Sequence, residues 1–346
     1  MNRRQKMKIA GQIGLVILGI AVIYLIVMLI DNRIGIFESD DTDDSYEEEE
    51  LPIDIDGKIY ELSHEMSTYL VMGTDNSGNE EADERKDYVG SMADFMLLLV
   101  VDDTDQTYQY IQLNRDTITE VPFLLADGTS YASADIQMCC AHAYGGSKME
   151  SCENTEKTVS MFLHGIPIDG YYALKMDAIP ELNHAVGGVT VTIEDDFTAI
   201  DPEMKPGTTL KLSDEQAYTF VHNRMDIGDG ENTSRMRRHR AYMDAMAKTV
   251  QEQAAKDKKY VTRVYNELSE YSTTDMGSKT LSSIAKKVNT YTNKGLVTPE
   301  GETKLGKALN DGLEHTEFYA DEDKLIKLIR DIYPLTEVGD AEDGEE

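Results

Sequence analysis

Two stretches near the front of the chain decide its fold, STYLVMGTD (Ser67–Asp75) and ADFMLLLVV (Ala93–Val101). Each holds a short apolar run bounded by polar residues, and a third segment with tyrosines at alternating positions follows them. Short apolar runs and alternation with a period of two are typical of β-strands. The sequence therefore predicts three strands, Ser67–Met72, Phe95–Val101 and Gln106–Leu113, that begin a sheet.

Helical and extended patterns alternate after these strands. One helical segment has a capping box at its start, because Gln216 stands three residues after Ser213. We predict helices at Thr155–His164, Ser213–Val221 and Ser234–Ala255, and strands between them at Tyr171–Lys175 and Val189–Ile193. Interleaved helices and strands predict an α/β or α+β sandwich.

The N-terminus has the pattern of a membrane anchor. Residues 9–30 contain no charged side chain, and a helix of that length crosses the hydrocarbon core of a bilayer. Arginines and lysines precede this run and acidic residues follow it, so the positive-inside rule places the rest of the chain outside the cytoplasm. A cleaved signal peptide agrees less well with the long run and the missing A-x-A-like site. A buried core helix agrees poorly with the basic flank.

Charge and periodicity divide the remaining chain. Three helical stretches follow the main domain, near Tyr265, at Lys279–Val288 and at Asp321–Ile332. We predict a cytoplasmic stub at 1–8, a transmembrane helix at 9–30, an acidic extracytoplasmic stalk at 31–60, the main domain at 61–256, a helical extension packed on it at 257–338 and an acidic tail at 339–346.

The overall charge excludes one class of partner. A formal net charge of −32 repels nucleic acid phosphates, so we expect no nucleic acid partner. The three cysteines, Cys139, Cys140 and Cys152, lack the spacing of a zinc site. A disulfide from Cys152 to one of the vicinal pair and three free thiols both remain open.

Two carboxylates are candidates for a metal site. Asp75 directly follows the first predicted strand, and Asp94 immediately precedes the second, so the two can meet at one edge of the sheet. Paired carboxylates at strand ends suit Mg²⁺ beside a substrate phosphate. The alternative interpretation is that each aspartate caps a turn.

Positive charge gathers, against the sign of the chain, around the start of one predicted helix. Arg235, Arg238 and His239 are three or four residues apart and share a helix face near its N-terminus, where the backbone dipole favours anions. The other arginines of the group are Arg224, Arg237 and Arg240, and Arg115 ends the third predicted strand beside Asp116. Arginine donates two hydrogen bonds to a phosphate, so the pattern favours a phosphate or pyrophosphate site. The alternative is a surface helix whose arginines pair with the abundant acids.

These residues resemble the blocks of the LytR-CpsA-Psr family, in the same order. The resemblance covers residues 69–250 and rests on Gly73-Thr74-Asp75, Ala93-Asp94-Phe95-Met96-Leu97, Asn114-Arg115-Asp116-Thr117, Ala143-Tyr144-Gly145-Gly146, Ile168-Asp169-Gly170-Tyr171, Ala185-Val186-Gly187-Gly188-Val189 and Arg235-Met236-Arg237-Arg238-His239. The form of the last block looks like that of clostridial members. The resemblance implies an α/β fold, a three-layer α-β-α sandwich around a central mixed sheet, with a tunnel for a polyprenyl chain.

The resemblance also implies a reaction. The domain at 61–256 would move a glycan or anionic polymer, such as teichoic acid or capsule, from a polyprenyl-pyrophosphate carrier to a peptidoglycan hydroxyl at the cell membrane. Asp75 and Asp94 would hold Mg²⁺, and Asp116 or Asp229 would orient arginines and accept the hydroxyl proton. The pyrophosphate would be bound by Arg115, Arg224, Arg235, Arg238, His222 and His239.

Several positions depart from the family pattern. Ser77 and Met92 stand where the family has arginine, and so does His222. Cys139 replaces the asparagine of the glycine block, and His239 replaces the final glutamine. A non-catalytic lipid- or polymer-binding paralogue is therefore an alternative. Transcriptional control is a third reading, which an outward-facing acidic domain does not favour.

Overall fold

The computed structural model describes residues 51–75, 90–125, 128–223, 227–228, 232–254, 256–257 and 260–340. The predicted stub and transmembrane helix, with most of the stalk and of the acidic tail, lie outside the described residues. Within those ranges, no helix combines the length and the apolar character that crossing a bilayer requires.

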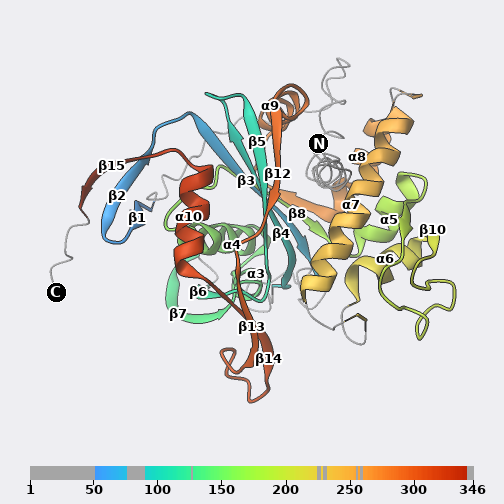
Figure 1. Ribbon diagram of the computed structural model, residues 1–346, viewed down its shortest axis with the longest axis horizontal. Coiled ribbons are helices and arrows are strands. Elements are labelled where there is room, and N and C mark those ends of the chain that lie inside the picture. The colour runs from blue at the N-terminus through green and yellow to red at the C-terminus, as the bar shows by residue number, and fades with distance from the viewer. Residues whose placement is uncertain are drawn as a thin grey trace, which may run out of the picture.

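A six-stranded mixed sheet forms the centre of the domain (Figure 1). Its strands are β3 Met66–Thr74, β4 Ala93–Asp102, β5 Thr107–Leu113, β8 Tyr171–Lys175, β11 Ser272–Thr274 and β12 Thr292–Val297. They lie in the order β11-β8-β3-β4-β5-β12. β3 pairs antiparallel with β4 and parallel with β8, and β5 pairs antiparallel with β4 and parallel with β12. The predicted α/β fold with a central mixed sheet is confirmed.

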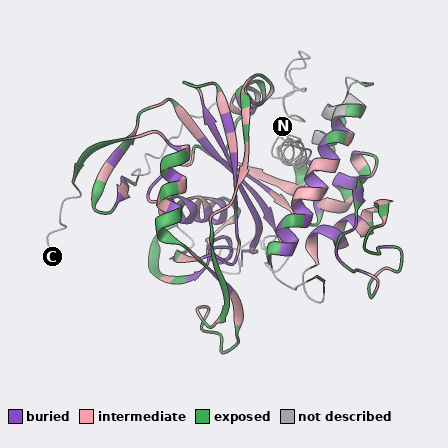
Figure 2. Cartoon of the chain, viewed as in Figure 1, coloured by how far each residue is buried: buried purple, intermediate pink, exposed green. Residues whose placement is uncertain are grey.

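Helices cover both faces of this sheet, which explains the unbroken apolar runs of β3 and β4 (Figure 2). The helices are α3 Cys140–Ala143, α4 Lys148–Phe162, α5 Ala178–Ala185, α6 Asp214–His222, α7 Asn232–Ala254, α8 Tyr260–Leu268, α9 Ser278–Thr290 and α10 Glu322–Ile332. Neighbouring residues of a strand point to opposite faces. Leu70 and Met72 therefore pack with α4 and α10, whereas Tyr69 and Val71 pack with α7 and α9.

A separate core joins α5, α6, α7 and α8 beside the sheet. The predicted capping box at the start of α6 is present in both directions: Ser213 Oγ accepts from the Gln216 backbone N–H, and the Gln216 side chain accepts from the Ser213 backbone N–H. This cap fixes the start of α6, and α6 ends at His222, close to the start of α7.

The end of the predicted acidic stalk is folded. β1 (Ile53–Ile55) and β2 (Lys58–Leu62) form a three-stranded sheet with β15 (Leu335–Asp340), in the order β1-β2-β15. Ile53, Ile55 and Tyr60 are buried in the same core as α4 and α10. Residues 51–60 therefore belong to the domain, because their apolar side chains find a core that the acidic residues before them lack.

The segment 257–338 is mixed, although the sequence predicted only helices there. α8, α9 and α10 occur as expected, but β11 and β12 form the two edges of the central sheet. A hairpin of β13 (Gly301–Gly306) and β14 (His315–Ala320) projects from the domain (Figure 1). The smaller pairs are β6 Ile118–Leu124 with β7 Ser130–Gln137, and β9 Thr190–Thr192 with β10 Thr209–Lys211.

Candidate active site

A β-bulge presents Asp94 at the start of β4. Gly73 pairs with Phe95 and Thr74 pairs with Ala93, so Asp94 is the additional residue between two paired positions. A bulge redirects the side chain of its extra residue. It places this carboxylate, which is 5% exposed, inside the domain rather than in the regular alternation of the sheet.

Two guanidinium groups hold the Asp94 carboxylate, one on each oxygen. Arg115 Nη1 pairs with Oδ1, and Arg235 Nη1 donates to Oδ2 at 2.8 Å. Burial alone would raise the pKa of Asp94, but the attraction of Arg115 and Arg235 outweighs it and leaves the pKa below its ordinary value. Asp94 is therefore ionised at neutral pH. Asp116 Oδ1 lies 3.4 Å from Arg115 Nε as well, so two guanidinium groups face two carboxylates in this cluster.

Arg235 is positioned by a bridge of two asparagines. It lies in the first turn of α7, where Asn232 Oδ1 accepts from Arg235 Nε and Nη2 at 3.1 and 2.9 Å. Asn232 Nδ2 donates in turn to Asn114 Oδ1 at 2.7 Å. An arginine at a helix N-terminus is opposed by the helix dipole. Asp94 compensates this repulsion, and a bound anion would compensate it further.

Arg115 extends from the end of β5 into a sulfur-rich environment. Its Nη2 donates to Cys139 Sγ at 2.8 Å and contacts Met92 Sδ at 3.2 Å, while Nε lies 3.4 Å from Asp116 Oδ1. Burial raises the pKa of the Cys139 thiol well above its ordinary value, so the sulfur is neutral. Cys139 and Met92 therefore position Arg115 without neutralising it.

Asp75 lies at the same end of the sheet as Asp94. Its backbone N–H donates to the Met92 carbonyl, and its Oδ1 accepts from the Met92 backbone N–H at 2.9 Å. Burial raises the pKa of Tyr218, and the carboxylates of Asp177, Asp75 and Asp94 raise it further. The ring of His222 stacks on Tyr218 at 4.7 Å. His222 is the last residue of α6.

Arg238 faces away from this cluster. Its Nη1 donates to Asp195 Oδ2 at 2.9 Å, its Nε donates to the Phe220 carbonyl at 2.9 Å, and its Nη2 donates to the Asn223 carbonyl. The guanidinium also lies 5.4 Å from the centre of the Phe197 ring. These contacts tie α7 to the end of α6 and to the loop after β9. They support a positioning role for Arg238.

His239 is neutral and faces the core. It is 5% exposed, and burial, with a smaller effect of nearby Arg235, lowers its pKa to about 3. Its Nε2 therefore carries the hydrogen and donates to the Val221 carbonyl at 2.8 Å, while Nδ1 meets no donor within the described part of the chain. An uncharged ring attracts a phosphate little. Arg224 and Asp229 lie outside the described residues.

Asp195 and Asn114 are the contacts that the sequence analysis missed. Asp195 accepts from both Arg238 and Arg237, the latter at 2.6 Å, and thereby fixes the start of α7. The run of three acidic residues after a predicted strand, Glu194-Asp195-Asp196, was the available signal. No local pattern marks the Asn114–Asn232 contact, because 118 positions separate the two residues.

The donor atoms fit Mg²⁺ only in the company of an anion. Both Asp94 oxygens already face guanidinium groups, so a cation bound there alone would meet two positive charges. Each carboxylate oxygen keeps a second lone pair. Asp75 and Asp94 could therefore hold the ion once a pyrophosphate neutralises the arginines.

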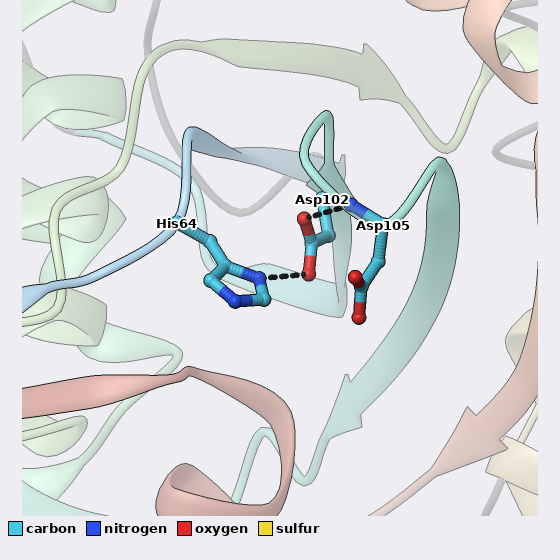
Figure 3. A group of neighbouring side chains, drawn as sticks. All are labelled: His64, Asp102 and Asp105. Atoms are coloured by element: carbon cyan, nitrogen blue, oxygen red, sulfur yellow. Dashed lines mark hydrogen bonds and ion pairs between the residues drawn. The ribbon is translucent and has the colours of Figure 1, made fainter.

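A second group of possible ligands lies at the opposite end of β4. Side-chain atoms of His64, Asp102 and Asp105 lie within 4.8 Å of one another and could hold a metal ion (Figure 3). His64 Nδ1 is 2.9 Å from Asp102 Oδ2, and Asp102 Oδ1 accepts from the Asp105 backbone N–H at 2.9 Å. Asp102 lies eight positions after Asp94 along an extended strand, about 26 Å away. This group is therefore remote from the arginines.

An apolar cavity of about 60 Å³ adjoins the bulge on the face of α7. Gly73 and Phe95 form the cross-strand pair on one side of the bulge. Both line the cavity, together with Met176, Tyr242 and Met243. Cβ at Gly73 would lie 3.1 Å from both Met176 Sδ and Phe95 Cβ, so glycine permits this close packing. The paired arginines and carboxylates thus have an apolar cavity beside them.

The structure is an α/β domain in which two arginines and two carboxylates lie beside an apolar cavity. A model of the LytR_cpsA_psr family matches residues 33–328, and the chain belongs to this family. Family members are proteins of the cell envelope. The clostridial form of the last block stays a prediction.

Curated relatives share about half of their length with this chain. The polyisoprenyl-teichoic acid–peptidoglycan teichoic acid transferase TagU of Halalkalibacterium halodurans is 28% identical over 166 residues, 48% of this chain and 50% of the relative. Biofilm regulatory protein A of Streptococcus mutans is 30% identical over 190 residues, 52% of this chain and 43% of the relative. The family thus includes transferases that attach teichoic acid to the wall.

Solved structures share the fold. Protein gbs0355 of Streptococcus agalactiae superimposes with a TM-score of 0.59 at 23% identity and covers 77% of this chain and 86% of its own. TagV of B. subtilis gives 0.55 at 19%, covering 78% and 97%. TagT, solved with LI-WTA bound, gives 0.52 at 16%, covering 77% and 89%. At these identities the likeness concerns the fold alone.

Proposed function

We propose that this protein is a phosphotransferase of cell wall biogenesis, which moves a glycan or anionic polymer from a polyprenyl-pyrophosphate carrier to peptidoglycan. The observation that carries the proposal is the buried Asp94, held between Arg115 and Arg235 beside an apolar cavity. A pyrophosphate attached to a hydrocarbon chain has a charged part that would contact the arginines and an apolar part that would enter the cavity. The cavity is small, so its walls would have to part to admit a polyprenyl chain.

The residues divide the chemistry between them. The oxygen of a wall hydroxyl would form a bond to the polymer-side phosphorus, the P–O–P bond would break, and polyprenyl phosphate would leave. Arg115 and Arg235 would stabilise the charge that moves to the leaving phosphate. Asp116, buried beside Arg115, or Asp229 would accept the hydroxyl proton. Asp75 and Asp94 would hold Mg²⁺, which would supply charge neutralisation at the pyrophosphate.

We further propose that the chain is a single-pass membrane protein with a cytoplasmic N-terminus. The carrier lipid and the wall then both lie on the side of the folded domain. Residues 9–30 support this topology through their apolar run and basic flank.

The direct test is transfer by the full chain in detergent micelles. A polyprenyl-pyrophosphate-linked polymer mixed with peptidoglycan is expected to give covalent product that survives detergent washing. Binding of the carrier lipid without product, under conditions where a TagU transferase turns over, would favour the non-catalytic alternative, which the positions Ser77, Met92 and His222 motivate.

Metal removal provides a separate prediction. Chelation with EDTA is expected to lower the transfer rate at least about tenfold, because the pyrophosphate charge loses a counterion worth several kcal/mol. Excess Mg²⁺ should restore the rate, and Asp75→Asn should raise the Mg²⁺ concentration that half-restores it. The matched control is Asp105→Asn, which changes the remote carboxylate group. An unchanged rate in EDTA would refute the metal requirement and leave the role of the arginines untouched.

A further inference from the structure

A patch of aromatic and apolar side chains is exposed on the β6–β7 hairpin, next to the end of α3. Tyr131 is 62% exposed, Leu125 48% and Tyr144 37%. The ring centre of Phe123 lies 4.4 Å from that of Tyr144 and 6.2 Å from that of Tyr131. Leu124, between Phe123 and Leu125, donates its backbone N–H to the Tyr144 carbonyl. We call Phe123, Leu125, Tyr131 and Tyr144 the β6–β7 patch.

A β-bulge turns Tyr131 toward this surface. Phe123 pairs with Ala132 and Leu124 pairs with Ser130, so Tyr131 is the additional residue between two paired positions. In a regular strand Tyr131 would point to the face opposite that of Ala132 and Phe123. A bulge redirects the side chain of its extra residue. The Tyr131 ring therefore lies beside Phe123 instead of on the other face of the hairpin.

The β6–β7 patch adjoins the candidate active site through one small core. Phe123 and Met92 both pack against the buried cluster that contains Cys139. Met92 and Cys139 also contact the guanidinium of Arg115. The exposed patch and the proposed pyrophosphate site therefore share one apolar cluster.

The side chains of the patch match the interface of a lipid bilayer. Tyrosine joins an apolar ring to a polar hydroxyl, and such side chains are enriched where a membrane meets water. Phenylalanine and leucine gain free energy by leaving water for the acyl boundary. None of the four side chains is charged, whereas the chain has a formal net charge of −32. Attraction between this domain and a bilayer would therefore come from apolar burial and not from net charge.

The predicted anchor would keep this patch close to a bilayer. Residues 31–50 connect the predicted transmembrane helix with Leu51, the first described residue, and a segment of that length reaches at most about 70 Å. A tether makes docking intramolecular and gives the patch a high effective concentration at the membrane. A contact too weak to recruit a free domain is then sufficient.

We propose that the β6–β7 patch docks on the outer surface of the cell membrane, with Leu125 and the rings of Phe123 and Tyr131 at the acyl boundary. The proposal rests on the proposed function, since it assigns the surface that meets the membrane holding the donor lipid. Docking brings the Arg115 end of the sheet to the headgroups, where the pyrophosphate of that lipid lies. The hairpin thereby orients the domain and takes no part in the chemistry.

The test uses a tryptophan, because the chain contains none of its own. Tyr131→Trp is prepared as the full chain in phosphatidylcholine nanodiscs, with and without bromine on the acyl chains. Bromine quenches a tryptophan that lies at the acyl boundary, so brominated lipid is expected to lower the emission at least about twofold. The matched control is Ile200→Trp, at a 48% exposed position between β9 and β10, on the side of the domain away from β6–β7 (Figure 1). Its emission is expected to stay unchanged.

A second substitution tests whether the patch itself causes the quenching. Leu125→Asp, combined with Tyr131→Trp, is expected to abolish it, because a carboxylate resists transfer from water to the acyl boundary. Ile200→Asp in the same background adds the same charge elsewhere and is expected to leave the quenching unchanged. Both positions are about half exposed, so the circular dichroism spectra should match that of the wild type.

The outcomes separate docking from topology and from transfer. Equal emission in both lipids for Tyr131→Trp in a chain that co-elutes with nanodiscs, or equal quenching of Ile200→Trp, overturns the docking without bearing on transfer. Quenching that survives Leu125→Asp overturns it as well, and so does a dimer in which the patch is shielded from iodide but not quenched by bromine. A chain that does not co-elute overturns the topology and the docking together. Docking as expected, without transfer in the separate assay, supports the patch and removes the transferase function.

Discussion

Arg115→Ala is expected to lower kcat/KM for polymer transfer by about 10²–10³-fold, the loss typical of removing one preorganised donor to developing charge. Arg115 pairs with Asp94 and is directed by Met92 and Cys139. Asp94 keeps its partner Arg235 in the variant, so the carboxylate is not left unpaired. The loss should therefore appear in transfer before it appears in folding.

Two further substitutions make the Arg115 result specific. Arg115→Lys keeps the charge but loses the planar fork, and an intermediate rate is expected. Arg263→Ala removes an arginine of α8 that is paired at the surface with Asp257 and should transfer at the wild-type rate. Rates would be measured with the lipid-linked polymer, and thermal unfolding would be recorded for each variant. Wild-type transfer by a folded Arg115→Ala protein would remove Arg115 from the site.

The strands of the sheet could be predicted because their signal is local. β3, β4 and β5 are recognisable from apolar runs or alternation, and Tyr171–Lys175 was predicted with the bounds that β8 has. The cap of α6 was recognisable for the same reason, since Ser213 and Gln216 are three residues apart. Patterns of this kind require no knowledge of distant residues.

The C-terminal strands gave no such signal. Five of the six residues of β13 are exposed, and its sequence GETKLG has neither alternation nor an apolar run. It forms because its backbone pairs with β14 over six positions. β12 forms an edge of the central sheet for a similar reason, through parallel pairing with β5. Pairing partners, rather than local propensity, determine such strands.

The candidate site was predictable in part. Asp94 and Arg115 were predicted as site residues because they lie at strand ends. In the structure both arginines, Arg115 and Arg235, contact Asp94, although Arg235 lies 141 residues from Asp94 in the sequence. The spacing of Arg235 and Arg238 predicted a shared face, but Arg238 contacts Asp195 and two carbonyls instead. Helix periodicity shows which residues are neighbours and does not show which surface covers them. The end of α6 covers Arg238.

Asp94→Asn is expected to lower the free energy of unfolding by about 3 kcal/mol, near the lower end of the range for breaking a buried ion pair from one side. The Asp94 and Arg235 side chains are 5% and 4% exposed, so water cannot replace the lost charge. The asparagine amide would direct two donors toward guanidinium groups that only donate. Urea unfolding of the full chain in micelles, followed by circular dichroism, measures the difference.

The pH dependence of that difference follows from the sign of the shift. The folded-state pKa of Asp94 is lowered, mainly because Arg115 and Arg235 outweigh burial. Its ionised form therefore stabilises the fold fully above the unfolded pKa of about 3.9, and this stabilisation is lost as pH falls through the lower folded pKa. Wild-type stability should fall below about pH 4 more steeply than that of Asp94→Asn. Asp257→Asn, which removes a surface partner of Arg263, should keep the wild-type slope. Parallel curves for wild type and Asp94→Asn would show that the two arginines do not depend on this carboxylate, and the anion site would then need another organising group.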